Sequence, residues 1–139
     1  MTHTKYFKRI AQGLDVDPLL ELIDAKPELW KEITARQKFT KSPHKDTECI
    51  YVRGALKMTP YYVLWDTGSY DYPCMEYLKP ALVPLMRPIL EKLEVEEMGR
   101  VLIVNLKPCG HVTKHSDQGT YADYYLSLIH ISEPTRRLV

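Results

Sequence analysis

The segment Arg100–Tyr121 constrains the fold of this chain more than any other stretch. It begins with a nearly continuous apolar run, Val101–Leu106, and such β-branched runs are typical of strands buried in a sandwich or barrel. Pro108-Cys-Gly110 then has the composition of a tight turn, in which Gly110 can adopt a positive φ. We therefore expect a strand, a turn and a second strand that ends at His115-Ser-Asp117.

His115 and Asp117 are the candidate catalytic residues and metal ligands. Side chains two residues apart in an extended strand point to the same side, so an imidazole and a carboxylate would project together. They supply two of the three groups in the 2-His-1-carboxylate set, which holds non-heme Fe(II) and leaves positions open for substrate and oxygen. His-x-Asp alone is a common surface pair. The strand and turn before it favour a metal site at the mouth of a barrel.

Cys109, His111 and His115 offer an alternative metal set, because zinc sites use cysteine and histidine ligands. A paired Cys-x-x-Cys is absent from the sequence, and Cys109 falls in the expected turn. We therefore favour the His115 and Asp117 pair. His111 is interpreted as an exposed or hydrogen-bonded residue of the turn.

The order Arg, apolar strand, Leu-x-Pro-x-Gly and His-x-Asp-x-Gly-x-Tyr resembles the aspartyl/asparaginyl β-hydroxylase family of Fe(II)/2-oxoglutarate oxygenases, which includes proline-hydroxylating members. The matching positions are Arg100, Leu106, Pro108, Gly110, His115, Asp117, Gly119 and Tyr121. Trp30, Arg36 and an early strand within His44–Arg53 are also similar. The resemblance extends from about Trp30 to Tyr125, and only its His-x-Asp block is specific.

This resemblance implies a double-stranded β-helix, a jelly-roll or cupin-like barrel, with N-terminal helices that support one sheet. It also implies that His115 and Asp117 bind Fe(II), with 2-oxoglutarate as co-substrate, and that the intact protein hydroxylates an Asp, Asn or Pro side chain of a peptide or amino acid. The family's later histidine ligand, its Arg-x-His pair and its 2-oxoglutarate-binding arginine have no credible match here. We expect the chain as given to be inactive. The alternative function is a cupin-like module that binds a metal or small molecule without redox chemistry.

The tail Leu126–Val139 is interpreted as non-native. Residues 126–136 are those that a transposase-type sequencing-library adapter encodes, codon for codon, and such segments are excluded from fold reasoning. His130 is therefore not used as a third ligand, although an ordinary strand at Tyr124–Ile131 is the other interpretation. We expect residues 1–125 to be the N-terminal part of one oxygenase domain, truncated so that sheet edges and an apolar face stay uncovered.

Composition excludes several classes of function. With 139 residues, of which 45% are hydrophobic and 27% charged, the chain can form one globular domain with a real core. A net charge of +1 and the absence of a long apolar run argue against nucleic acid or a membrane as partner. Three cysteines without framework spacing favour a reducing, cytoplasmic compartment.

The remaining pattern predicts an α+β fold, with helices packed on an antiparallel sheet. We expect a helix that starts at Asp17-Pro18 and ends before Pro27, helices at Pro27–Ala35 and Met75–Leu93, strands at Cys49–Arg53 and Tyr61–Trp65, and a loop at Gln37–Asp46. Prolines recur every fourth residue in the Met75–Leu93 helix, so we expect it to be kinked or segmented with its prolines on one side. The aromatic segment Tyr61–Tyr77 either lines a substrate groove or covers the sheet; we favour the second.

Overall fold

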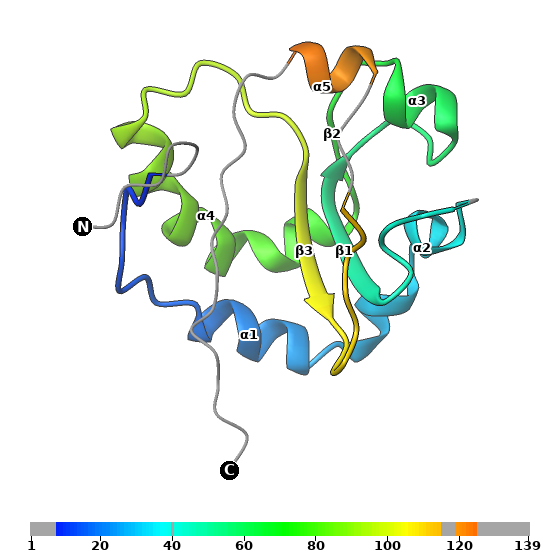
Figure 1. Cartoon of the computed structure of the whole chain (residues 1–139). Coiled ribbons are helices and arrows are strands. Elements are labelled where there is room, and N and C mark those ends of the chain that lie inside the picture. The colour runs from blue at the N-terminus through cyan, green and yellow to red at the C-terminus, as the bar shows by residue number, and fades with distance from the viewer. Residues whose placement is uncertain (1–7, 40, 115–118, 125–139) are drawn as a thin grey trace.

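The structure is a computed structural model that describes residues 8–39, 41–114 and 119–124 (Figure 1). It confirms the α+β class, with a three-stranded antiparallel sheet of order β2-β1-β3. The elements are α1 (Asp17–Asp24), the 3-10 helix η1 (Pro27–Lys31), α2 (Ala35–Lys38), β1 (Thr47–Gly54), α3 (Pro60–Leu64), β2 (Tyr70–Asp71), α4 (Cys74–Lys92), β3 (Val101–Leu106) and α5 (Thr120–Tyr124). The predicted ligand pair and the tail 126–139 lie outside the described residues.

Strand β1 forms the centre of the sheet and is buried on both faces. As expected, Ile50 and Val52 share one face, where they join a core that includes residues of α1 and α4. Cys49 and Tyr51 alternate with them and therefore face the other side. They are only 0% and 7% exposed, so this second face is covered as well.

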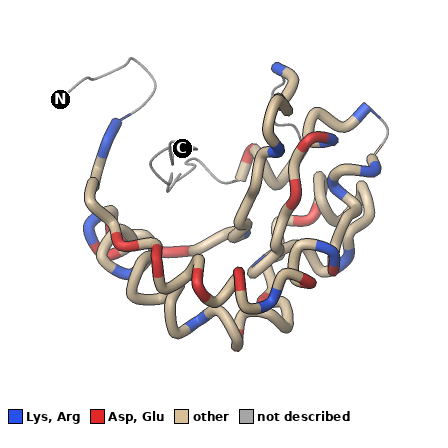
Figure 2. The backbone as a smooth tube through the Cα atoms, turned by 90° about the horizontal axis from the view of Figure 1, so that it is seen from below, with Lys and Arg blue, Asp and Glu red and all other residues tan. Residues whose placement is uncertain are grey.

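One apolar cluster holds the helices against the sheet. Helices α1 and α4 present their apolar stripes to β1, and the Tyr77 hydroxyl of α4 donates a hydrogen bond to the Leu22 carbonyl of α1 at 2.6 Å. The buried members of the cluster are Leu19, Ile23, Leu29, Ile50, Val52, Cys74, Leu78, Leu82 and Leu85. Lys and Arg residues are interspersed with Asp and Glu residues along the backbone (Figure 2).

Helix α4 departs from the expected segmentation, because it is one helix of 19 residues that includes Pro80, Pro84 and Pro88. All three prolines are exposed, which confirms that they lie on one side. On that side the carbonyl groups that lose their helical partners can bind water instead, so the helix continues. Among the described helices, none is both long and apolar enough to cross a membrane.

Two sequence predictions near the sheet were wrong. The predicted strand Tyr61–Trp65 is instead helix α3, which starts at Pro60. Proline suits the first turn of a helix, and this local signal prevails over the strand preference of the aromatic residues. The predicted helix Pro27–Ala35 is replaced by the shorter η1, and α2 begins at Ala35 and enters the predicted loop.

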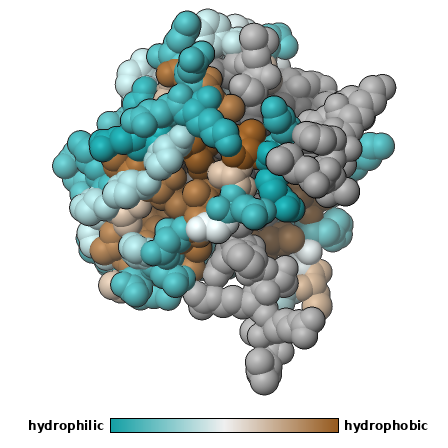
Figure 3. Space-filling view, turned by 90° about the vertical axis from the view of Figure 1, so that its left-hand side faces the viewer, coloured by the Kyte–Doolittle hydropathy of each residue, from teal (hydrophilic) through white to brown (hydrophobic). Residues whose placement is uncertain are grey.

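Strand β3 is confirmed, but the expectation that it is fully buried was wrong. Val101 and Ile103 pack against the core, whereas Val104 and Leu106 are 50% and 48% exposed. These two side chains are exposed because β3 pairs only with β1 and lies at the edge of the described sheet. Figure 3 shows the left-hand side of the molecule as drawn in Figure 1, where apolar residues reach the surface between hydrophilic ones.

Candidate functional site

Both flanks of the predicted ligand pair are described, although His115 and Asp117 are not. We call residues 111–119 the ligand segment, since it contains both predicted ligands. The chain turns after β3 and residues 111–114 run back along the sheet, while α5 lies at its opposite end (Figure 1). The structure therefore shows how the two ends of the ligand segment are held.

The turn before the ligand segment forms as expected, with the Gly110 amide donating to the Lys107 carbonyl at 2.9 Å. The expected positive φ, however, falls on Cys109 (φ 62°) and not on Gly110. Gly110 matters for another reason, because a Cβ there would come within 2.8 Å of the Asp46 Cβ. The glycine thus permits the turn to pack directly against Asp46.

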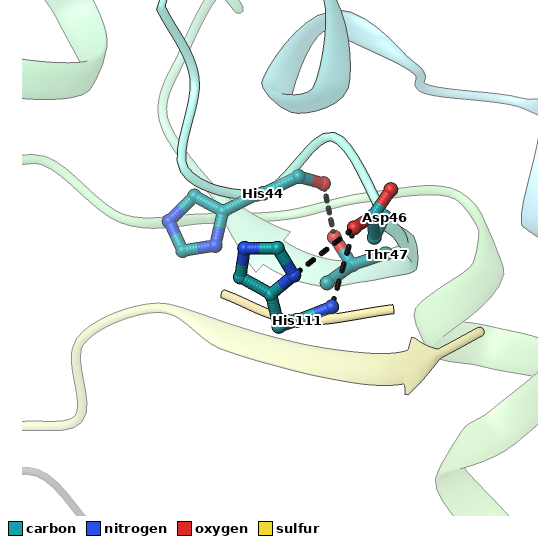
Figure 4. A network of polar contacts seen from close by, with 4 residues as sticks. All are labelled: His44, Asp46, Thr47 and His111. Carbon is teal, nitrogen blue, oxygen red and sulfur yellow. Dashed lines mark hydrogen bonds and ion pairs between the residues drawn. The ribbon is translucent and has the colours of Figure 1, made fainter. Parts of the chain in front are cut away.

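Asp46 holds the first end of the ligand segment, and we call this contact the Asp46 anchor. Its carbonyl accepts a hydrogen bond from the Lys107 amide at 3.0 Å, and its carboxylate Oδ2 accepts one from the His111 amide at 3.2 Å (Figure 4). The His111 Nδ1 atom lies 3.9 Å from the same oxygen, and the imidazole is 74% exposed. These contacts confirm His111 as an exposed turn residue.

The expected second strand is absent over residues 111–114, which have no strand structure. The Asp46 carboxylate, rather than a neighbouring strand, takes the first amide of this stretch. The argument that His115 and Asp117 share a face rested on that strand. Both of these residues lie outside the described part of the chain.

Arg100 holds the second end, and we call its contacts the Arg100 anchor. Its Nη1 donates to the Val63 carbonyl at 2.6 Å, and its Nη2 donates to the carbonyls of Tyr62 and Asp66, both at 2.9 Å. The C-terminal carbonyls of a helix lack helical partners and carry partial negative charge. The guanidinium therefore caps α3 and ties it to the start of β3.

Helix α5 completes the Arg100 anchor. The Arg100 guanidinium lies 3.7 Å from the centre of the Tyr121 ring, and the Arg100 amide donates to the Tyr121 hydroxyl at 2.9 Å. The Tyr124 hydroxyl donates to Glu97 Oε2 at 2.8 Å. Gly119 has φ +98°, and an added Cβ would overlap the Leu64 carbonyl oxygen. The end of the ligand segment is thus packed closely against α3.

A third group of polar residues lies beside β1, and we call Arg36, His44, Cys49 and Tyr51 the Arg36 cluster. Arg36 Nη1 donates to the Cys49 sulfur at 3.4 Å, and Nη2 lies 3.1 Å from His44 Nε2. Arginine has only donors, so His44 Nε2 accepts and its ring proton is on Nδ1. The structure thereby brings together Arg36 and the early strand, which the sequence had only marked separately.

Electrostatics single out Tyr51 within this cluster. Desolvation by burial raises the pKa of its phenol well above the usual value, and the positive charge of Arg36 is the largest opposing influence. The charge of Arg100 also lowers this pKa. Burial likewise raises the pKa of Tyr72, whose hydroxyl donates to the Ala55 carbonyl.

The chemistry of the predicted donors fits Fe(II), because an imidazole and a carboxylate are two of the ligand types that such sites use. The described residues contain no group of three or more His, Cys, Asp or Glu side chains that could hold a metal. The zinc alternative needs His115, and of its other members Cys109 is exposed and His111 lies at the Asp46 anchor. A metal site that includes His115 or Asp117 involves residues outside the described part of the chain.

Sequence reasoning missed both anchors and the Arg36 cluster as structural units. Arg100, Gly119 and Tyr121 carried a signal only as positions of the family pattern, and Asp46 carried none. No family model, no curated protein and no solved structure matches this chain.

Proposed function

We propose that this chain is part of an Fe(II)- and 2-oxoglutarate-dependent hydroxylase that acts on an amino-acid side chain, Asp/Asn or Pro. The observation that supports it best is the position of His115-x-Asp117 on a segment that the Asp46 and Arg100 anchors hold at both ends. Metal sites require donors kept in one geometry by the surrounding protein. The described flanks of the ligand segment are each held by several contacts, as a site of this kind needs.

In this proposal His115 and Asp117 bind the metal, and the iron with 2-oxoglutarate supplies the oxidising chemistry when bound. The other residues have a positioning role. Arg100 and Tyr121 fix the distance from the ligand segment to β3, and Asp46 fixes its start beside β1. Small displacements of reacting groups are costly in catalysis, so both anchors would affect turnover without touching the substrate.

The proposed fold of the intact protein is a jelly-roll barrel of which this chain forms one part. Support comes from the exposed Val104 and Leu106 on the edge strand β3, where further strands could pair and cover the apolar surface. Those strands would also have to bring the third ligand and the arginine for 2-oxoglutarate. The cytoplasmic location belongs to the same proposal.

The first experiment is to read the source gene beyond the codon for Tyr125. We expect the frame to continue into an Arg-x-His strand and then a distal histidine followed by an arginine. If the codons for 126–139 and a stop are genuine, the hydroxylase proposal fails. A cupin-like binding module then becomes the better explanation.

The second experiment uses the intact gene product. Asp117→Ala should abolish Fe(II)-dependent formation of succinate from 2-oxoglutarate, because it removes a proposed ligand. Asp24→Ala removes an exposed carboxylate at the end of α1 and should leave succinate formation unchanged. Equal activity of the two variants would remove Asp117 from the ligand set.

A further inference from the structure

Arg36 reaches the second face of the sheet, where its hydrogen-bond partners among the described residues are neutral groups. Its side chain is half-buried, and its two terminal nitrogens contact a thiol sulfur and a neutral imidazole nitrogen. None of the ion pairs among the described residues involves Arg36. Guanidinium groups that leave bulk water usually pair with an anion, so neutral partners here leave the charge of Arg36 uncompensated.

Tyr51 lies two residues beyond Cys49 on β1 and therefore projects from the same face of that strand. The residue is 7% exposed, and its hydroxyl takes part in no hydrogen bond among the described residues. The hydroxyl oxygen is not one of the buried polar atoms that lack a partner, so it retains contact with solvent and can donate to a bound group. The charged side chains that influence it include Arg36 and Arg100, and no carboxylate is among the groups that act on it most strongly.

We propose that Arg36 and Tyr51 form a binding site for a carboxylate, and that its ligand is the carboxylate of the amino-acid substrate. A guanidinium binds both oxygens of a carboxylate through two parallel hydrogen bonds, which are about twice as strong as neutral ones. The entering carboxylate replaces two neutral acceptors, Cys49 Sγ and His44 Nε2. The Tyr51 hydroxyl donates a further hydrogen bond to one oxygen.

The site lies between the two anchors along β1. Asp46 directly precedes Thr47, the first residue of β1, whereas Val101, which follows Arg100, pairs with Arg53 near the other end of that strand. The ligand segment connects these ends, and Tyr51 lies on β1 between them. A carboxylate held at Arg36 and Tyr51 would thus lie between the two anchors of the ligand segment.

The assignment to the substrate rests on the proposed function, whereas the carboxylate site does not. It can be measured on the 139-residue chain without iron, by saturation-transfer NMR on the ligand signals of L-aspartate. We expect Arg36→Gln to weaken binding about tenfold or more, since a charge-assisted pair is lost. Lys38→Gln removes the same charge from the exposed end of α2 and should change the dissociation constant by less than about twofold.

Two further measurements do not depend on the folding of the Arg36 variant. Tyr51→Phe should weaken binding about threefold to tenfold, because one hydrogen bond is lost. Acetate should bind and acetamide, its neutral counterpart of similar shape, should not. Equal binding of acetate and acetamide, or an unchanged affinity in Arg36→Gln, would overturn the carboxylate site.

Competition binding experiments distinguish a substrate carboxylate from that of 2-oxoglutarate. Displacement of L-aspartate by L-asparagine or L-proline at lower concentration than by 2-oxoglutarate assigns the site to the substrate. Preferential displacement by 2-oxoglutarate or by inorganic phosphate overturns that assignment. If succinate formation depends on Asp117 but no carboxylate binds at Arg36, this inference is wrong and the proposed hydroxylase stands. If a carboxylate binds at Arg36 but succinate formation does not depend on Asp117, the carboxylate site stands and the proposed hydroxylase is wrong.

Discussion

The two anchors of the ligand segment differ in almost every physical respect. The Asp46 anchor uses one carboxylate, 33% exposed, and two hydrogen bonds to backbone amides. The Arg100 anchor uses a half-buried guanidinium that donates to three carbonyls and stacks on Tyr121. Charged contacts near water contribute little to stability, whereas hydrogen bonds to a charged group away from water contribute about 1.5–3 kcal/mol each.

This difference implies that the ligand segment is held more firmly at its α5 end than at its β3 end. Regions with few buried contacts open locally at a lower free-energy cost than the rest of a protein. We therefore expect the Asp46 anchor to open first and the Arg100 anchor to open only with α3 and α5. Four substitutions test this order.

Loss of Arg100 should have the largest effect. Arg100→Met keeps much of the aliphatic packing but removes three charged hydrogen bonds and the stacking on Tyr121, so the free energy of unfolding should fall by about 3 kcal/mol. Urea denaturation measures the loss, and hydrogen exchange should accelerate in α3 and α5. Arg87→Met, at an exposed position of α4, is the matched control and should change stability little.

The Tyr121→Phe variant separates the two contributions within this anchor. It keeps the ring beside the guanidinium and removes the acceptor for the Arg100 amide, so it should cost about 1 kcal/mol. A loss as large as that of Arg100→Met would show that the hydroxyl, and not the guanidinium, carries the anchor.

Gly119→Ala should have the second largest effect after Arg100→Met, about 2 kcal/mol, since the new Cβ meets the Leu64 carbonyl in a backbone that already has positive φ. Gly13→Ala provides the control, because Gly13 also has positive φ (+70°) but nothing lies within 4 Å of the added Cβ. It should cost about 1 kcal/mol from backbone strain alone. Equal losses of thermal stability in the two variants would show that Gly119 is needed for its φ and not for close packing.

Substitution of Asp46 should have the smallest effect. Asp46→Ala removes one exposed acceptor and should lower the free energy of unfolding by about 0.5 kcal/mol, with faster hydrogen exchange confined to residues 107–114. His111→Ala should change neither quantity, because the backbone amide of residue 111 and not its exposed ring makes the hydrogen bond. A loss comparable to that of Arg100→Met would abolish the proposed difference between the anchors.

The elements that could be predicted are those with a strong local signal. The 3.6-residue stripe of α4 and the apolar alternation of β1 gave correct elements, and regular spacing placed the prolines of α4 on the exposed side. Local signals competed at Tyr61–Trp65, where aromatic residues favour a strand and Pro60 favours a helix. There the sequence pattern gave the wrong element.

The candidate site also has parts that the sequence predicts and parts that it does not. His115 and Asp117 were predicted from their spacing, from the strand and turn before them and from the family resemblance, and their structure lies outside the described residues. The partners of Arg36 and Arg100 could not be predicted, because each arginine contacts groups that are 8 to 38 residues away in the chain. Contacts at such separations depend on how helices and strands pack.

By itself the sequence determined the α+β class, the turn after β3 and the nature of the candidate ligands. These follow from short-range spacing, since residues that are two or four positions apart have fixed relative directions in strands and helices. Only the tertiary structure decided that β3 is a half-exposed edge, that Gly110 is needed for contact with Asp46, and that Arg100 joins α3 to α5. Those features depend on which distant segments come into contact, and the packing of the whole chain determines these contacts.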